Sequence, residues 1–314
     1  MAVPDARAVT AVPAPAGHSG RRRAKNTLVW SLCALSLALM AAPVVWILWG
    51  IVAKAVPHWQ WSVLTTDQIG NGGGLLNAIE GTGVIVLGVL ILGGGLGIAG
   101  GLYLAEYAPA GRGQLLRGAS EVLSGVPSIV LGYVGYLSFV VALHWGFSLA
   151  AGIIVLSLLV VPYITKMTEV AIRNVPTSYR EGGEALGMRS GYMLRHLVLR
   201  PALPGVVTGL IVAAAISVGE TAPLLYTAGW STRGPTFALT HSPVGYLTYV
   251  VWTFWDEPYA ASRQLAYSGA LLLVVLVVLL IVVSRLVVAL TQRYSPDRRE
   301  RLPRRAKPPR SPGP

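Results

Sequence analysis

The chain has 314 residues and a formal net charge of +12, and 54% of its residues are hydrophobic while only 12% are charged. A soluble domain carries about 25% charged residues, so this composition excludes an ordinary soluble domain and predicts an integral membrane protein. The basic excess is only a weak argument for nucleic-acid binding, because the basic residues lie between apolar runs, where they orient a membrane protein. We therefore expect no nucleic-acid partner.

Residues 1–26 are rich in Ala, Pro and Gly and end in a basic cluster, which predicts a disordered cytoplasmic arm. A cleaved signal peptide is the alternative. The apolar run at 28–56 is too long for the core of a signal peptide, and no convincing small-x-small cleavage site follows it. We predict that this run is the first transmembrane helix. The single cysteine, Cys33, lies within it; it cannot form an intrachain disulfide or a metal cluster, and we expect it to be a small core residue.

Five more apolar runs follow, and several approach or exceed the roughly 20 residues that a helix needs to cross a bilayer. Six spans predict an all-α, polytopic transmembrane bundle with both termini on one side. We divide the chain into the arm, a transmembrane domain at 27–292 and a disordered basic tail at 293–314. The five further spans are expected at residues 82–105, 119–142, 147–165, 204–219 and 265–290.

The basic residues predict the orientation of this bundle. With six spans, the arm, the tail and the connection at 176–201 lie on one strongly basic side, together with Arg112 and Arg117. We expect this side to be cytoplasmic. The basic residues on the opposite side are only Lys54, Arg233 and Arg263.

Two segments are expected outside, at residues 57–80 and about 222–264. The first has turn signals and no basic residue. The second is rich in aromatic residues, which suit the membrane–water interface, and part of it is expected to form a short surface helix. These aromatic residues are Trp230, Tyr246, Tyr249, Trp252, Trp255 and Tyr259.

The stretch LGGGLGIAGG at residues 92–101 contains the Gly-x-Gly-x-x-Gly pattern of dinucleotide-binding sites. That site needs a strand, a turn and a helix, whereas this stretch lies inside a predicted transmembrane run, so we reject the dinucleotide interpretation. Gly93, Gly97 and Gly101 recur at every fourth residue. This spacing predicts a helix face that lets a second helix approach closely.

Motifs for chemistry on this chain are absent from the sequence. It contains no G-x-x-x-x-G-K-[ST] phosphate loop, no H-E-x-x-H motif, no Cys/His cluster and no G-x-S-x-G elbow. We therefore expect neither an ATPase site nor a hydrolytic or metal site on this chain.

The stretch YREGGEALGMRSGYMLRHLVLRPALPG, at residues 179–205, is unusually charged for a connection between apolar runs. One interpretation is a cytoplasmic connector that is basic only because of topology. The alternative is a docking element that a partner holds. The charged residues are Arg180, Glu181, Glu184, Arg189, Arg195 and Arg200.

The pattern of this connection predicts a helix–turn–helix. Thr177 or Ser178, with Glu181 close behind, predicts an N-terminal cap. Gly187 is expected to end the short helix, and a second segment is expected at 190–199. The return to the membrane is expected at Pro201 and Pro204.

This connection resembles the EAA coupling motif of ABC-type import permeases, E-A-A-x-x-x-G with a later I-x-L-P ending. The resemblance implies that the loop docks a separate ATPase. The docking residues that it implies are Glu181, Glu184, Ala185 and Gly187, and Leu197 and Leu199 fit the ending. The departures are Gly182 and Gly183 in place of alanines, which weaken a helix by up to about 1 kcal/mol each, and Arg200 in place of proline, with Pro201 one residue late.

Three further stretches are similar to the phosphate-import permeases of the PstA family: GLYLAEYAP at 101–109, GVPSIVLGY at 125–133 and GETAPLLYTA at 219–228. The resemblance covers about residues 80–290. It implies a type I ABC importer permease in the bacterial plasma membrane, forming half of a pathway for inorganic phosphate. It further implies a homologous PstC-like permease subunit, a PstB-like ATPase dimer that hydrolyses ATP, an external PstS-like binding protein and no cofactor on this chain.

A purely structural membrane adaptor is the weakest alternative, and two other kinds stay open. The first is a permease for another oxyanion, such as sulfate or molybdate. The second is a membrane-embedded enzyme or a channel, against which the loop pattern argues.

Ionisable residues at membrane depth cost roughly 2.5–3.5 kcal/mol each, so they are candidates for function. Lys166, Glu169 and Arg173 recur on one helical face as cation, anion and cation. They are expected either to contact or gate phosphate or to form an intrahelical ion pair at the cytoplasmic membrane edge. The resembled family usually has an arginine at the position of Lys166.

Glu220 and Thr221 follow a glycine and precede Pro223, a pattern that predicts a broken helix lining a cavity. We expect Glu220 either to orient a cation or accept a hydrogen bond from protonated phosphate, or to cap the next helix. The family often has an arginine four residues earlier, where this chain has Ile216, so one expected cation is missing.

Overall fold

The computed structural model describes residues 19–236 and 238–292, and it divides into two compact units, Met1–Ala53 and Lys54–Pro314. Helix α1 (Ser19–Ala55) accounts for the described part of the first unit. It begins within the predicted arm; the rest of the arm and the predicted tail lie outside the described residues. A candidate membrane span at Ala24–His58 confirms the first predicted helix.

The prediction that Cys33 is a small core residue was wrong, because its side chain is exposed. None of the apolar window of this span is buried by protein. In a membrane helix, lipid replaces a protein core as the apolar environment, so an apolar residue does not require burial within the chain.

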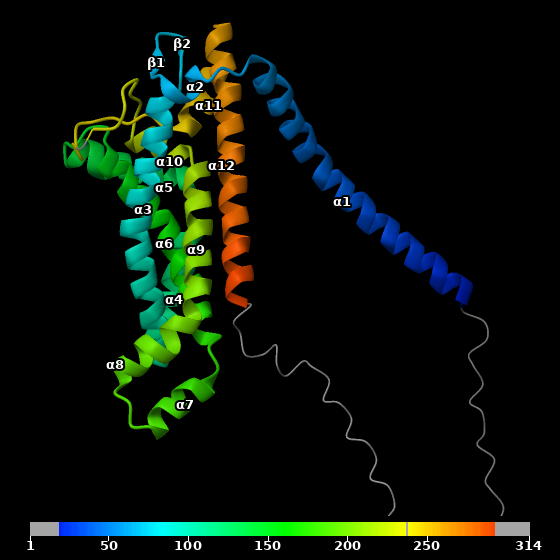
Figure 1. Ribbon diagram of the computed structural model, residues 1–314, viewed down its shortest axis with the longest axis vertical. Helices are drawn as coiled ribbons and strands as arrows, with labels where there is room; N and C mark the ends of the chain where they lie inside the picture. The colour runs from blue at the N-terminus through cyan, green and yellow to red at the C-terminus, as the bar shows by residue number, and fades with distance from the viewer. Residues whose placement is uncertain (1–18, 237, 293–314) are drawn as a thin grey trace, which may run out of the picture. The chain divides into compact units, whose positions relative to one another are not determined.

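The second unit is a helical bundle with one small hairpin, which agrees with the expected all-α class (Figure 1). The hairpin pairs Gln68 with Gly73 in antiparallel register. The first long helix of the bundle, α3, follows the hairpin and ends in a π-helical turn. The elements in order are η1 (Val56–His58), α2 (Ser62–Thr65), β1 (Gln68–Ile69), β2 (Gly72–Gly73), α3 (Leu76–Leu102) and η2 (Tyr103–Tyr107).

The predicted span at 119–142 was wrong in shape. It is instead a pair of segments, Ala110–Ser124 and Ser128–Ala142, bent by 92°. Gly125 has low helix propensity, and Pro127 disfavours the helical conformation of the residue before it, so the helix stops there. The segments are α4 (Ala110–Ser124), α5 (Ser128–Gly135) and the π-helical η3 (Tyr136–Ala142). The described ranges thus hold five candidate spans, or six if the bent pair counts as one.

The connection at 176–201 begins after α6 (Leu149–Arg173) and contains α7 (Thr177–Ala185). Gly187 follows α7 with φ at +67°, which confirms the predicted end of this helix. The predicted cap was wrong: Pro176 occupies the N-cap and no side chain bonds there. A proline N-cap enters the helix with preset backbone angles and cannot offer a capping oxygen.

The second segment of the connection continues directly into the membrane helix, so the predicted separate re-entry was wrong. Ser190–Gly219 forms one candidate span. Pro201 and Pro204 lie within this continuous helix, and transmembrane helices tolerate such prolines because neighbouring groups satisfy the freed backbone. The elements are α8 (Ser190–Met193), η4 (Leu194–Val198) and α9 (Leu199–Gly219).

The aromatic segment contains α10 (Ala222–Thr227) and the expected short helix, α11 (Leu247–Trp255), and α12 (Ala260–Gln292) follows it. Trp230 stacks on Tyr249, with ring centroids 4.5 Å apart, and Tyr246 is buried. The interface prediction was wrong for these three, because they pack together in the core. Trp252, Trp255 and Tyr259 are exposed, as interface aromatics would be.

Close packing of α3 on α6 confirms the predicted glycine face. A Cβ atom added at Gly93 would lie 3.2 Å from the Cα of Ser157, and one added at Gly97 would lie 2.6 Å from the Cβ of Ile164. These contacts are closer than real Cβ atoms normally reach. The glycine face therefore sets how near α6, which carries Lys166, lies to α3.

Candidate functional site

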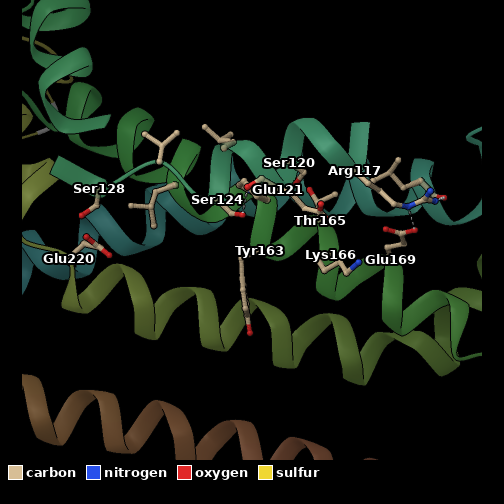
Figure 2. A pocket seen from close by; sticks show the side chains of 15 residues that line it. Arg117, Ser120, Glu121, Ser124, Ser128, Tyr163, Thr165, Lys166, Glu169 and Glu220 are labelled. Carbon is tan, nitrogen blue, oxygen red and sulfur yellow. Dashed lines mark hydrogen bonds and ion pairs between the residues drawn. The ribbon is translucent and has the colours of Figure 1, made fainter. Parts of the chain in front are cut away.

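A cavity of about 470 Å³, with both apolar and polar lining, lies between α4, the α4–α5 bend, α6 and the break after α9 (Figure 2). It brings hydroxyl groups, cations and carboxylates together within an apolar helical bundle. Its polar lining consists of Arg117, Ser120, Glu121, Ser124, Ser128, Tyr163, Thr165, Lys166, Glu169 and Glu220.

Helix α4 supplies one wall of the cavity. Arg117, Ser120 and Ser124 are spaced at i, i+3 and i+7, which places them on one helical face. The bend at 125–127 then brings Ser128, the first residue of α5, opposite the end of α9. There the Ser128 side chain lies beside the carboxylate of Glu220 (Figure 2).

Helix α6 supplies the opposite wall, where Glu169 is 4% exposed. Arg117 Nε donates to Glu169 Oε1 over 2.8 Å, and Arg173 Nε lies 3.0 Å from the same oxygen. Each arginine also donates through Nη2 to the Leu104 carbonyl over 3.3 Å. A buried carboxylate is costly unless paired, and two guanidinium groups here more than neutralise it.

The structure brings three of the five predicted substrate-path residues to this cavity: Lys166, Glu169 and Glu220. Arg173 does not line it, but it forms the anticipated intrahelical ion pair with Glu169. Thr221 lines a separate cavity of about 530 Å³. The predicted break in the helix at Glu220 and Thr221 is confirmed, since these two residues, between α9 and α10, belong to no helix.

Lys166 differs from the two arginines. Its side chain reaches the cavity, and no ion pair to it is present in the part of the chain that the structure describes. Ile216 packs beside the apolar core of α3 and α6, so no cation stands where the resembled family has its arginine. Arg117 is the additional cation at this cavity.

Sequence reasoning missed Arg117 as a site residue, and it missed the three serines. Arg117 was interpreted only as a determinant of topology. The serines do carry a signal, since Ser120, Ser124 and Ser128 recur at every fourth residue. Within the described ranges, no group of side chains that would hold a metal ion is present.

The predicted docking residues lie together at one end of the bundle, opposite the β1–β2 hairpin (Figure 1). Glu181, Glu184, Ala185 and Gly187 are all exposed. Gly183 is buried, and a Cβ there would lie 2.9 Å from the sulfur of Met193, so this departure from the motif lets α7 pack closely on the following segment.

The fold and the apolar spans define a multi-pass permease of the kind found in ABC importers. It resembles a chain of the inward-facing MetNI methionine ABC transporter, with a TM-score of 0.52 and 23% identity over 69% of this chain and 94% of that one. Residues 97–296 match the family of binding-protein-dependent transport system inner membrane components. The chain belongs to this family, and it is therefore a multi-pass protein of the cytoplasmic membrane.

Two phosphate permeases are similar to this chain over most of its length. The chain is 55% identical over 273 residues to phosphate transport system permease protein PstA 2 of Mycobacterium tuberculosis, covering 87% of this chain and 91% of the relative. It is 35% identical over 276 residues to phosphate transport system permease protein PstA of Yersinia pestis, covering 85% and 91%.

Proposed function

We propose that the chain is the permease subunit of an ATP-driven importer of inorganic phosphate and forms half of its transmembrane pathway. The similarity to PstA relatives along 87% of the chain supports this substrate. The observation that carries the proposal is the cavity, in which Lys166 and Arg117 stand beside serine and threonine hydroxyls. Phosphate leaving water needs such cations and donors, because its desolvation is otherwise prohibitive.

The proposed assembly contains the partners that the resemblance implies. They are a homologous PstC-like permease subunit, a PstB-like ATPase dimer and an external PstS-like binding protein. The ATPase hydrolyses ATP, and this chain binds no cofactor. In this proposed arrangement both termini and the α7–α8 segment face the cytoplasm, an orientation that the basic residues of the connections favour.

Alternating access is the proposed mechanism. Closure of the ATPase dimer moves α7, and the attached helices switch the exposure of the cavity between the two sides. Lys166 supplies positive charge to the bound anion. Glu220 accepts a hydrogen bond from a protonated phosphate oxygen, whereas Glu169 holds Arg117 at the wall. The proposed substrate path thus includes Glu220, Lys166 and Glu169. Arg173 acts on this path only through its ion pair with Glu169. Thr221 lines the neighbouring cavity.

Uptake of labelled phosphate tests the substrate. Cells that lack this chain and any redundant phosphate importer should regain uptake at limiting phosphate when the chain is restored. Unlabelled phosphate should compete, whereas a large excess of sulfate or molybdate should not. Competition by sulfate or molybdate would move the assignment to that oxyanion, and uptake without the ATPase partner would indicate a channel.

Changes in the docking loop should impair uptake while the protein still inserts. Gly187→Ala forces a side chain into a backbone at φ +67°, which costs roughly 1–2 kcal/mol, and Glu181→Ala removes an exposed charge from the motif. We expect each change to lower the uptake rate about fivefold or more, the scale of an ordinary coupling free energy. The measurement is initial uptake normalised to the amount of membrane-inserted chain.

Gly182→Ala is the control for both changes, because it lies within α7, next to Glu181. A Cβ at Gly182 meets no atom within 4 Å, and alanine favours a helix by up to about 1 kcal/mol over glycine. Uptake should be retained. Normal uptake by Gly187→Ala and Glu181→Ala would remove the coupling role from this loop.

A further inference from the structure

Arg180 stands within the docking loop, yet its side chain points into the protein. Its Nη2 forms an ion pair with Glu106 Oε1 of η2, a residue 74 positions earlier in the chain. The same guanidinium donates to the carbonyls of Val175, over 3.1 Å, and Ile172, over 3.4 Å. The side chains of Arg180 and Glu106 are only 23% and 19% exposed. Arg180 thus joins the start of α7 to the end of α6 and to the turn that ends α3.

The η2 turn has a second set of polar contacts. The N–H of Ala108 donates to the Tyr103 carbonyl, and Pro109 has no N–H. The Leu104 carbonyl is therefore left without either of these backbone donors. It instead accepts from Arg117 and Arg173, the two arginines that hold Glu169 at the cavity.

These contacts form one polar path from the docking loop to the cavity. It runs from Arg180 to Glu106, along two residues of η2 to Leu104, and through the paired arginines to Glu169. Its charge-assisted contacts are stronger and more directional than the apolar contacts around them. A displacement of α7 must therefore move η2 or break the Arg180–Glu106 pair.

We propose that Arg180 and Glu106 are positioning residues that transmit movement of α7 through η2 to the cavity. Neither residue lines the cavity, and the pair acts by keeping α7 and the end of α3 together as the loop moves. This inference rests on the proposed coupling of α7 to an ATPase.

A double-mutant cycle in the assembled importer tests the pair. The permease subunits, ATPase and binding protein are reconstituted in liposomes, and phosphate uptake and ATP hydrolysis are measured together. Arg180→Gln and Glu106→Gln should each lower the phosphate carried per ATP hydrolysed by about fivefold or more. The double variant should be no worse than either single one, because one contact can be lost only once.

Two further variants separate transmission from structure. Arg180→Lys keeps the charge but loses the guanidinium fork, so its ratio should fall between those of wild type and Arg180→Gln. Arg112→Gln removes an equal charge from an exposed position on α4, and it should leave the ratio unchanged. The proposal would be overturned if Arg180→Gln left the phosphate carried per ATP unchanged. It would also be overturned if the loss in the double variant equalled the product of the two single losses.

Loss of the assembled complex in every pair variant, Arg180→Lys included, would also overturn it, since the pair would then serve only the fold. If the wild-type complex carries sulfate or molybdate and not phosphate, the substrate assignment fails. The same ratio is then measured with that anion, so the two failures are distinguishable.

Discussion

Gly101→Ala should weaken the bundle by forcing α3 and α6 apart. Its added Cβ would lie 2.5 Å from the Cβ of Thr168 and 2.6 Å from the Thr165 carbonyl oxygen. A backbone carbonyl cannot swing aside, so α3 and α6 must separate. Overpacking of this kind typically costs about 1–3 kcal/mol. We expect a lower midpoint of thermal unfolding for the detergent-solubilised chain and a loss of uptake, because α6 carries one wall of the cavity.

Gly95→Ala is the control for this prediction. It lies on the same helix, and a Cβ there meets no atom within 4 Å. The thermal midpoint should stay the same or rise, since alanine favours the helix. Equal midpoints for Gly95→Ala and Gly101→Ala would show that the glycine face does not set the contact between α3 and α6.

Lys166→Ala should reduce phosphate uptake about tenfold or more at limiting phosphate. Within the described structure, Lys166 forms no ion pair, whereas Arg117 is already committed to Glu169. The lysine is thus the cation most available to an anion in the cavity. A hydrogen bond to a charged group contributes about 1.5–3 kcal/mol, and each 1.4 kcal/mol is a factor of ten in binding. The measurement is the initial rate of labelled-phosphate uptake against phosphate concentration.

Two variants make this prediction specific. Lys166→Arg keeps the positive charge and should retain most uptake, whereas Arg112→Ala removes a charge from an exposed site outside the cavity and should leave uptake normal. If Lys166→Ala restored phosphate uptake fully, Lys166 would be a residue of the cytoplasmic membrane edge with no role in transport. The importer assignment would then depend only on its own uptake test.

Features that depend on neighbouring residues were predictable. The runs of apolar residues located the helices at 82–105 and 265–290, which the candidate spans Leu76–Tyr107 and Ala260–Leu290 contain. The four-residue glycine spacing identified the packed face of α3. Gly187 marked the end of α7, since a glycine tolerates the positive φ found there. Lys166, Glu169 and Glu220 stood out because charge within apolar sequence is costly.

Features that join distant segments were not predictable from pattern alone. The 92° bend between α4 and α5 was not predicted, because the hydropathy of an apolar run does not reveal a change in the direction of the chain. Trp230 was expected at an interface and is instead stacked in the core, since its partner Tyr249 is supplied by another element.

The helical class and most of the apolar spans follow from the sequence alone, because length, hydropathy and residue spacing act locally along the chain. Which charged groups meet depends on how the helices pack in three dimensions. Arg117 and Glu169 are 52 residues apart, and Arg180 and Glu106 are 74 apart, yet both pairs form ion pairs. These pairs form because α3 packs closely on α6 and because the chain bends after α4. Neither arrangement can be read from the spacing of residues along the sequence.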